Sequence, residues 1–242
     1  MKIQPKAIAA VIMAVIVILE WRKGYFKGLK TYRPSLTSPP YPAFFLSLPV
    51  LMAILLPLDP FLLEGIQSFG VHYPKVVDFG GFIGKNVNFW YILGGAYLVS
   101  LVIKKEWSEK IFSALLASAL TGLVVHFLKM VFLRARPDAG FGPFSLLNWD
   151  GLWKGTRAFQ SFPSGDVALV AGAAAYFFYE SKNRFFRWLI FLFPLSNALS
   201  RVSGSRHWFS DTAFSMGIAL VLARMIWDYR KHVLNFSSHE NS

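Results

Sequence analysis

The sequence predicts an all-α membrane protein whose helices cross the bilayer several times. Of its 242 residues, 55% are hydrophobic and 17% aromatic, whereas only 16% are charged. Soluble domains carry about 25% charged and about 45–50% apolar residues. The 24 Phe, 8 Trp and 9 Tyr residues exceed what the core of a soluble domain of this length can hold. This composition excludes a disordered chain and argues against a soluble enzyme.

The apolar residues cluster into blocks that predict six core spans and one additional N-terminal helix. The six expected spans are 42–63, 87–103, 111–132, 167–179, 188–199 and 209–227. Several are shorter than the roughly 20 residues of a perpendicular transmembrane helix, so we expect their ends to extend into neighbouring amphipathic residues. The earlier block 7–19 lacks a small-residue cleavage site after it, which favours an uncleaved helix that either crosses the membrane or lies in its interface.

Proline-rich residues 37–42 form the clearest break and divide the chain into three parts. We expect a membrane-associated helix with a basic interfacial segment in 1–41, a six-helix domain in 42–230, and a polar tail in 231–242. The chain contains no Cys, which excludes disulfides, thiolate metal sites and Cys nucleophiles.

The net charge of +12 predicts the orientation of the chain. On a soluble protein such an excess would indicate nucleic-acid binding, but on a membrane protein it indicates Lys/Arg-rich cytoplasmic loops and no nucleic-acid partner. The basic segments that the six spans bring to one side are 22–41, 104–110, 180–187 and the tail. The other side carries 64–86, 133–166 and 200–208, where polar and Gly-rich segments indicate the functional face.

A first group of candidate residues is Lys129-x6-Arg136-Pro137. Lys129 and Arg136 lie seven residues apart, two helical turns, so both can project from one face at a helix end, and Pro137 stops the helix. The alternative is a pair of cations that extend to the interface at a membrane boundary.

A second group is Pro163-Ser164-Gly165-Asp166, directly before an apolar helical block. A Ser-Gly turn that opens a helix directs free backbone N–H groups and the positive end of the helix dipole outward, which favours anion binding. The alternative is an ordinary N-cap formed by Ser164 or Asp166.

A third group is Ser200-Arg201-x5-His207-x3-Asp211. His207 and Asp211 are four residues apart and would be neighbours on a helix. An Asp that accepts one imidazole N–H leaves the other ring nitrogen free as nucleophile or base, and Arg201 supplies a fork-shaped phosphate ligand. The predicted topology brings all three groups to the same outer face.

These three motifs, in this order and spacing over roughly 42–228, resemble the type 2 phosphatidic acid phosphatase superfamily. The resemblance implies a six-helix membrane bundle that hydrolyses lipid phosphates through a phosphohistidine intermediate, without a metal or other cofactor. It implies that His207 is the nucleophile and that Asp211 orients it. It further implies a cradle for the phosphoryl oxygens, formed by Lys129, Arg136, Ser164, Gly165 and Arg201.

Asp166 departs from the family pattern, which has His at this position as the acid that protonates the leaving alcohol. An Asp anion beside a phosphate is repulsive unless Arg134, Arg157 or another cation pairs with it. Three outcomes are open: Asp166 is protonated by its surroundings and still acts as the acid; the leaving group hardly needs an acid; or the protein only binds lipid phosphate. The second outcome, with some contribution from the first, is our hypothesis.

This hypothesis points to a sugar anomeric phosphate or a diphosphate as substrate, because such groups leave as weaker bases than a primary alcohol. The expected activity is that of a lipid A 1-phosphatase in a bacterial inner membrane, with its site on the periplasmic face. Undecaprenyl diphosphate, phosphatidylglycerol phosphate and phosphoryl transfer to a second lipid remain alternatives. Other classes are a non-catalytic lipid-phosphate-binding protein, a haloperoxidase and a transporter.

Three further side chains lie near the motifs in sequence. We expect Arg134 and Arg157 to support the site from behind or to contact the lipid headgroup, with simple solvation as the alternative. His126 lies one turn before Lys129. It could line the pocket, but we expect a packed interior histidine.

Overall fold

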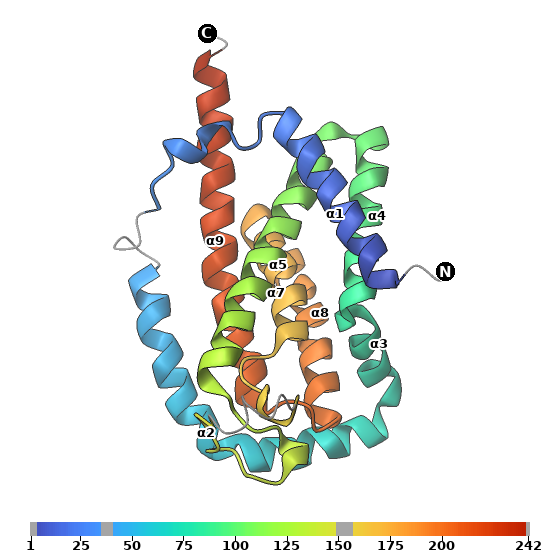
Figure 1. Ribbon diagram of the computed structural model, residues 1–242, viewed down its shortest axis with the longest axis vertical. Coiled ribbons are helices and arrows are strands. Elements are labelled where there is room, and N and C mark those ends of the chain that lie inside the picture. Colours follow the sequence, from blue (N-terminus) through green and yellow to red (C-terminus); the bar gives the residue numbers. More distant parts are fainter. Residues whose placement is uncertain (1–3, 35–40, 149–156, 241–242) are drawn as a thin grey trace.

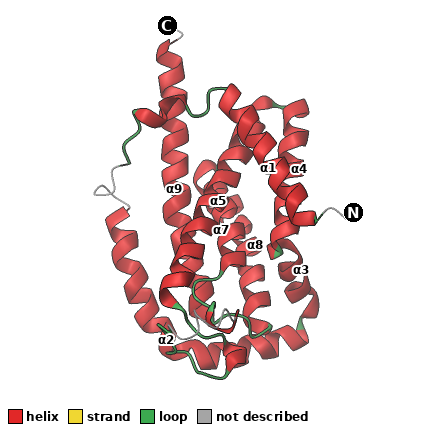
Figure 2. Ribbon diagram, viewed as in Figure 1, coloured by secondary structure: helices red, strands yellow, loops and turns green. Residues whose placement is uncertain are grey.

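The computed structural model describes residues 4–34, 41–148 and 157–240. Within these residues the chain is helical and has no strand, which confirms the predicted all-α class (Figure 2). The helices form an elongated bundle (Figure 1). Their bounds are α1 Pro5–Arg22, α2 Tyr41–His72, α3 Pro74–Gly84, α4 Asn86–Ile103, α5 Lys105–Phe132, α7 Gly165–Glu180, α8 Arg184–Ser203 and α9 Phe209–Glu240, with short 3-10 helices at Lys27–Lys30, Pro137–Ala139 and Arg157–Phe159.

Four segments of the described chain are long and apolar enough to cross a membrane, judged by length and composition. They are Tyr41–His72, Asn86–Ile103, Glu106–Ala139 and Phe209–Leu234. The chain is therefore a multi-pass membrane protein. α7 and α8 coincide with the remaining two expected spans, and their crossing of the bilayer stays a prediction, as does that of α1.

α7 is the central helix and packs against α5, α8 and α9. Ten consecutive residues, from Val167 to Tyr176, are buried. Five of these ten are Ala and one is Gly172, so neighbouring backbones can approach closely. A Cβ atom at Gly172 would lie only 2.7 Å from Ser118 Cα of α5. The small residues of α7 thus bring the helix ends that carry the candidate motifs close together.

α2 bends strongly, so that its first part runs along the bundle and its second part crosses the lower end (Figure 1). The helix contains Pro49, Pro57 and Pro60. Each proline removes a backbone N–H and its ring clashes with the carbonyl four residues earlier, which kinks a helix. The bend places one turn of α2 beneath the ends of α5 and α9.

Two segments expected to be polar connections are helical. Residues 64–86 continue α2 to His72 and then form α3, and residues 231–240 continue α9 to Glu240. The expectation of a Gly-rich outer loop at 64–86 is wrong because low apolarity marks the limit of a membrane block, not the limit of a helix.

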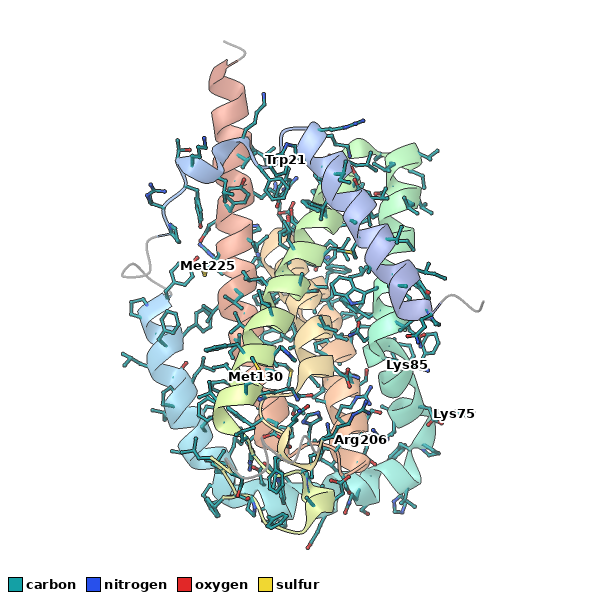
Figure 3. All side chains as sticks on the ribbon, in the orientation of Figure 1. Trp21, Lys75, Lys85, Met130, Arg206 and Met225 are labelled. Atoms are coloured by element: carbon teal, nitrogen blue, oxygen red, sulfur yellow. The ribbon has the colours of Figure 1, made fainter. Side chains whose placement is uncertain are left out.

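The upper end of the bundle is joined by buried polar contacts. Tyr97 Oη of α4 donates to Glu20 Oε1 of α1 at 2.6 Å, and Glu20 is fully buried. Arg230 of α9 lies 3.4 Å from Glu180 of α7. Figure 3 places Trp21 at this end and Arg206 at the opposite one. The two ends therefore differ: ion pairs connect helices at the upper end, and the candidate site lies at the lower end.

Replacing Gly172 with Ala is expected to destabilise the fold by about 1–3 kcal/mol, because the new methyl group would overlap α5. Thermal unfolding in detergent measures the effect. Gly95→Ala in α4 is the matched control, since a Cβ there meets nothing within 4 Å. Equal unfolding temperatures for the two variants would contradict the proposed close crossing of α5 and α7.

Candidate active site

Several helix ends and connections meet at the lower end of the bundle (Figure 1). α5 ends because Leu133 adopts a left-handed conformation, with φ of 41°. α7 begins at Gly165, and a short turn joins α8 to α9. Asp138 N donates to Ser205 O at 3.3 Å, which ties the segment after α5 to the turn before α9. This arrangement brings the three sequence motifs to one end of the molecule.

His207 lies just before α9, and its side chain is 5% exposed. Its Nδ1 atom is 2.8 Å from Ser161 O and 3.5 Å from Asp211 Oδ2. Since both neighbours are acceptors, the proton belongs on Nδ1 and the lone pair on Nε2. Burial lowers the pKa of the His207 imidazole below its usual 6.5, so the neutral ring is favoured at neutral pH. The ring is held as a neutral base with one free nitrogen.

The Asp211 carboxylate receives hydrogen bonds on both oxygens. Oδ2 accepts from Ser161 Oγ and from Trp208 N, the latter at 2.9 Å, and Oδ1 accepts from Arg134 Nη1. Ser161 therefore contacts Asp211 through its hydroxyl and His207 through its carbonyl. Sequence analysis assigned Ser161 no role. Its position shows that orientation of the imidazole is shared between Asp211 and the Ser161 backbone.

Arg134 is fully buried, and each of its guanidinium nitrogens donates a hydrogen bond. Nε and Nη2 donate to Pro143 O at 2.9 and 2.6 Å, and Nη1 donates to Ser210 Oγ at 2.7 Å. Nη1 also reaches Asp211, and Nη2 reaches Asp59 Oδ2 at 2.7 Å. A side chain enclosed in this way cannot contact a lipid headgroup. Arg134 instead lies behind the His207–Asp211 pair.

Asp59 of α2 completes this network and was missed by sequence analysis. The residue is fully buried, and it accepts hydrogen bonds from Ser210 N at 2.9 Å and from Arg134 Nη2. The available signal was a carboxylate between two prolines in the strongly apolar block 42–63. Ionisable residues within membrane segments are expensive and tend to be functional.

The candidate phosphate-binding residues include donor atoms that make no hydrogen bond within the described part of the chain. Lys129 Nζ donates to Gln160 O at 2.7 Å. Among the described residues, Arg136 Nε and Ser164 Oγ are buried and have no hydrogen-bond partner. Buried polar atoms are normally satisfied, so these two donors are available to an anion.

Ser164 occupies the N-cap position of α7, but its hydroxyl makes no capping hydrogen bond. The ordinary N-cap interpretation therefore fails for Ser164. Because α7 starts at Gly165, the first backbone N–H groups of the helix have no intrahelical acceptor. They add the positive end of the helix dipole to the unused donors.

Asp166 pairs with Arg201, whose Nε atom lies 3.2 Å from Asp166 Oδ2. The Asp166 side chain is 36% exposed and that of Arg201 is 16% exposed. The cation that offsets Asp166 is thus Arg201, whereas Arg134 is enclosed elsewhere and Arg157 is exposed in the segment before α7. Arg201, one of the candidate phosphate-binding residues, is therefore already paired with the Asp166 carboxylate.

A groove of about 410 Å³ opens beside this cradle, between α4, α5 and α7. Its polar end is formed by Lys129, Gly165, Asp166 and His126, and its lining also includes Trp90, Leu123 and Leu169. Leu123 is 68% exposed, so the groove opens on the outer face of α5. The expectation that His126 is a packed interior residue is wrong, because the side chain is exposed and lines the groove.

Two further cations surround the cradle. Arg157 and Arg206 are exposed, and both lie close enough to Arg136 for their charges to act on it. Figure 3 shows Arg206 at the lower end of the bundle. Arg206 directly precedes His207 in sequence but was not singled out. The site therefore carries a positive field around the unused donors.

The described residues contain no group of three or more His, Cys, Asp or Glu side chains that could hold a metal ion. The charges around the site are Lys and Arg cations together with the carboxylates of Asp166 and, near Arg136, Asp138. Such an arrangement binds an anion directly through protein donors.

A helical bundle with a buried His–Asp pair facing anion-binding donors defines a class of membrane enzymes that act on phosphate esters. The chain belongs to the PAP2 superfamily, which matches residues 110–233, just over half of the 242 residues. Members of this superfamily are phosphatases. The match covers all three motifs, whereas Asp59 precedes it. No curated protein and no solved structure matches the chain.

Arg134→Ala is expected to destabilise the protein by about 3–5 kcal/mol, because Asp59 and Asp211 would stay buried without their shared cation. Denaturant unfolding in detergent measures the loss. Arg157→Ala removes an exposed guanidinium and should change stability by less than about 0.5 kcal/mol. Similar losses in both variants would show that Arg134 is not the structural centre of the site.

Proposed function

We propose that this protein is a metal-independent lipid phosphatase that works through a phosphohistidine intermediate. The observation that carries the proposal is the position of His207. Its Nδ1 contacts Ser161 O, which leaves Nε2 as a nucleophile in a site where the charges of Lys129 and Arg136 act on the ring. A neutral, oriented imidazole and an unsatisfied anion cradle are the two parts that phosphoryl transfer to histidine requires.

In the first step, Nε2 of His207 attacks phosphorus as the bond to the lipid oxygen breaks. Lys129, Arg136, Arg201 and the first N–H groups of α7 stabilise the charge on the equatorial oxygens. The phosphorylated ring carries a positive charge, which Asp211 offsets across the 3.5 Å separation. Water then attacks phosphorus, the P–N bond breaks, and inorganic phosphate leaves.

A lipid substrate is supported by the membrane character of the bundle and by the groove at Lys129. The groove joins the cradle to the outer face of α5, so a substrate headgroup can reach Lys129 while its chains remain beside the bundle. We propose six crossings, by α2, α4, α5, α7, α8 and α9. With the basic segments on the cytoplasmic side, the site faces the periplasm of a bacterial inner membrane.

The Asp166–Arg201 ion pair bears on the choice of substrate. Asp166 Oδ2 lies 3.2 Å from Arg201 Nε, so this carboxylate is paired with a cation of the cradle and not directed at a leaving group. This supports a leaving group that takes no proton from Asp166, and the 1-phosphate of lipid A is our choice of substrate. Undecaprenyl diphosphate and phosphatidylglycerol phosphate share that cradle chemistry, and a phosphohistidine could also pass its phosphoryl group to a second lipid.

His207→Ala is expected to abolish release of inorganic phosphate, because it removes the proposed nucleophile. Phosphate release from a panel of lipid A, undecaprenyl diphosphate and phosphatidylglycerol phosphate in detergent micelles measures this. Wild-type protein should also trap an acid-labile phosphoenzyme. A variant as active as wild type would refute the catalytic role, and turnover of no phospholipid by wild type would favour a protein that only binds lipid phosphate.

The pH dependence of kcat/KM is expected to show an acid limb with its midpoint below pH 6.5. Attack requires neutral imidazole, and burial lowers the pKa of His207, so activity persists below the usual histidine pKa and is lost only at more acidic pH. Initial rates on the preferred lipid between pH 4 and 8 test this. A midpoint above pH 6.5 would contradict a desolvated nucleophile.

A further inference from the structure

We propose that His126 of α5 is the proton donor to the leaving group, a role that the family pattern would assign to the position of Asp166. This inference rests on the proposed phosphatase function. It starts from the groove, in which His126 and Asp166 line the same space from two different helices.

The in-line geometry of phosphoryl transfer requires the proton donor to lie on the groove side of the phosphate. In phosphoryl transfer the attacking and leaving atoms lie roughly in line on opposite sides of phosphorus. The leaving oxygen belongs to the lipid, and the groove is the opening that joins Lys129 to the exposed face of Leu123. The leaving oxygen therefore lies towards the groove, and His207 lies on the other side of the phosphate.

His126 is suited to this position by its place on α5. It precedes Lys129 by three residues, so both side chains project from the same face of the helix, and both line the groove. His126 lies one turn nearer the middle of α5 than Lys129. When Lys129 binds the phosphate, the ester oxygen of a lipid in the groove lies on the His126 side. The side chain is exposed, so it is free to approach a substrate.

Asp166 is less suited, because its carboxylate is paired with Arg201 at 3.2 Å. The charged groups that line the groove with His126 are Lys129 on α5 and Asp166 on α7, whereas α4 contributes the uncharged Asn86 and Trp90. Histidine is the side chain that changes protonation between about pH 5 and 8. It can therefore give a proton in one step and take one in the next.

His126 alone accounts for the proton given to the leaving group and the proton taken from water. As the P–O bond to the lipid breaks, the His126 imidazolium gives its proton to the leaving oxygen, which departs as an alcohol. Neutral His126 then takes a proton from the water that attacks the phosphohistidine, and phosphate leaves as the P–N bond breaks. His126 returns to its protonated form, and one water is consumed for each ester hydrolysed.

His126→Gln tests the role with two substrates that carry the same long chain. One is an alkyl phosphate, whose leaving group needs a proton, and the other is a nitrophenyl phosphate, whose leaving group does not. General acid catalysis contributes about 10²- to 10⁴-fold. The variant should therefore lose about 100-fold or more in kcat/KM, which reports only the first step, on the alkyl phosphate and less than about tenfold on the nitrophenyl phosphate.

The matched control is His72→Gln, the same exchange at a histidine at the end of α2 that contacts Ser68 O and does not line the groove. It should behave as wild type on both substrates.

Equal losses in kcat/KM on both substrates in folded His126→Gln protein, or no loss on the alkyl phosphate, would overturn the proposal. Failure of the proposed function has a different signature. In that case wild type hydrolyses neither substrate, or His207→Ala retains both activities.

Discussion

The fully buried guanidinium of Arg134 is the interaction on which the geometry of the site depends. A charge removed from water must be compensated by nearby charge and saturated hydrogen bonds. Arg134 meets this requirement by pairing with Asp211 of α9 through Nη1 and with Asp59 of α2 through Nη2. Because Asp211 and Ser161 in turn position His207, the orientation of the imidazole depends on a cation that never meets the substrate.

The site thus combines two kinds of polar environment. Around Arg134, donors and acceptors are matched, which makes the network rigid. A few residues away, Arg136 Nε and Ser164 Oγ are buried but unmatched among the described residues, and Asp166 already occupies one side of Arg201. The matched network holds the nucleophile in place, and the unmatched donors provide binding energy for an anion. The groove beside Lys129 connects this anion site to the membrane-facing surface.

Much of the fold could be predicted from the sequence, because apolar blocks and helix ends are local properties. Each of the six expected spans falls within a helix, and α7 begins at Gly165 as the motif predicted, whereas α5 ends at Phe132 and not at Pro137 because Leu133 adopts a left-handed conformation. The helical segment 64–86 was mistaken for a loop, since hydropathy reports contact with lipid and not backbone conformation. The expectation that the spaced pairs lie along one helix is wrong: α5 ends at Phe132, so Arg136 lies beyond it, and His207 precedes α9, which begins at Phe209.

The sequence by itself therefore determined the membrane class, the order of the helices and the three motifs that the superfamily match covers. Only the tertiary structure decided which charges meet. It enclosed Arg134 between Asp59 and Asp211, paired Asp166 with Arg201, and exposed His126 in the groove. The reason is physical: burial and ion pairing depend on helices that lie far apart in the chain, and a single sequence does not reveal which helix faces pack together.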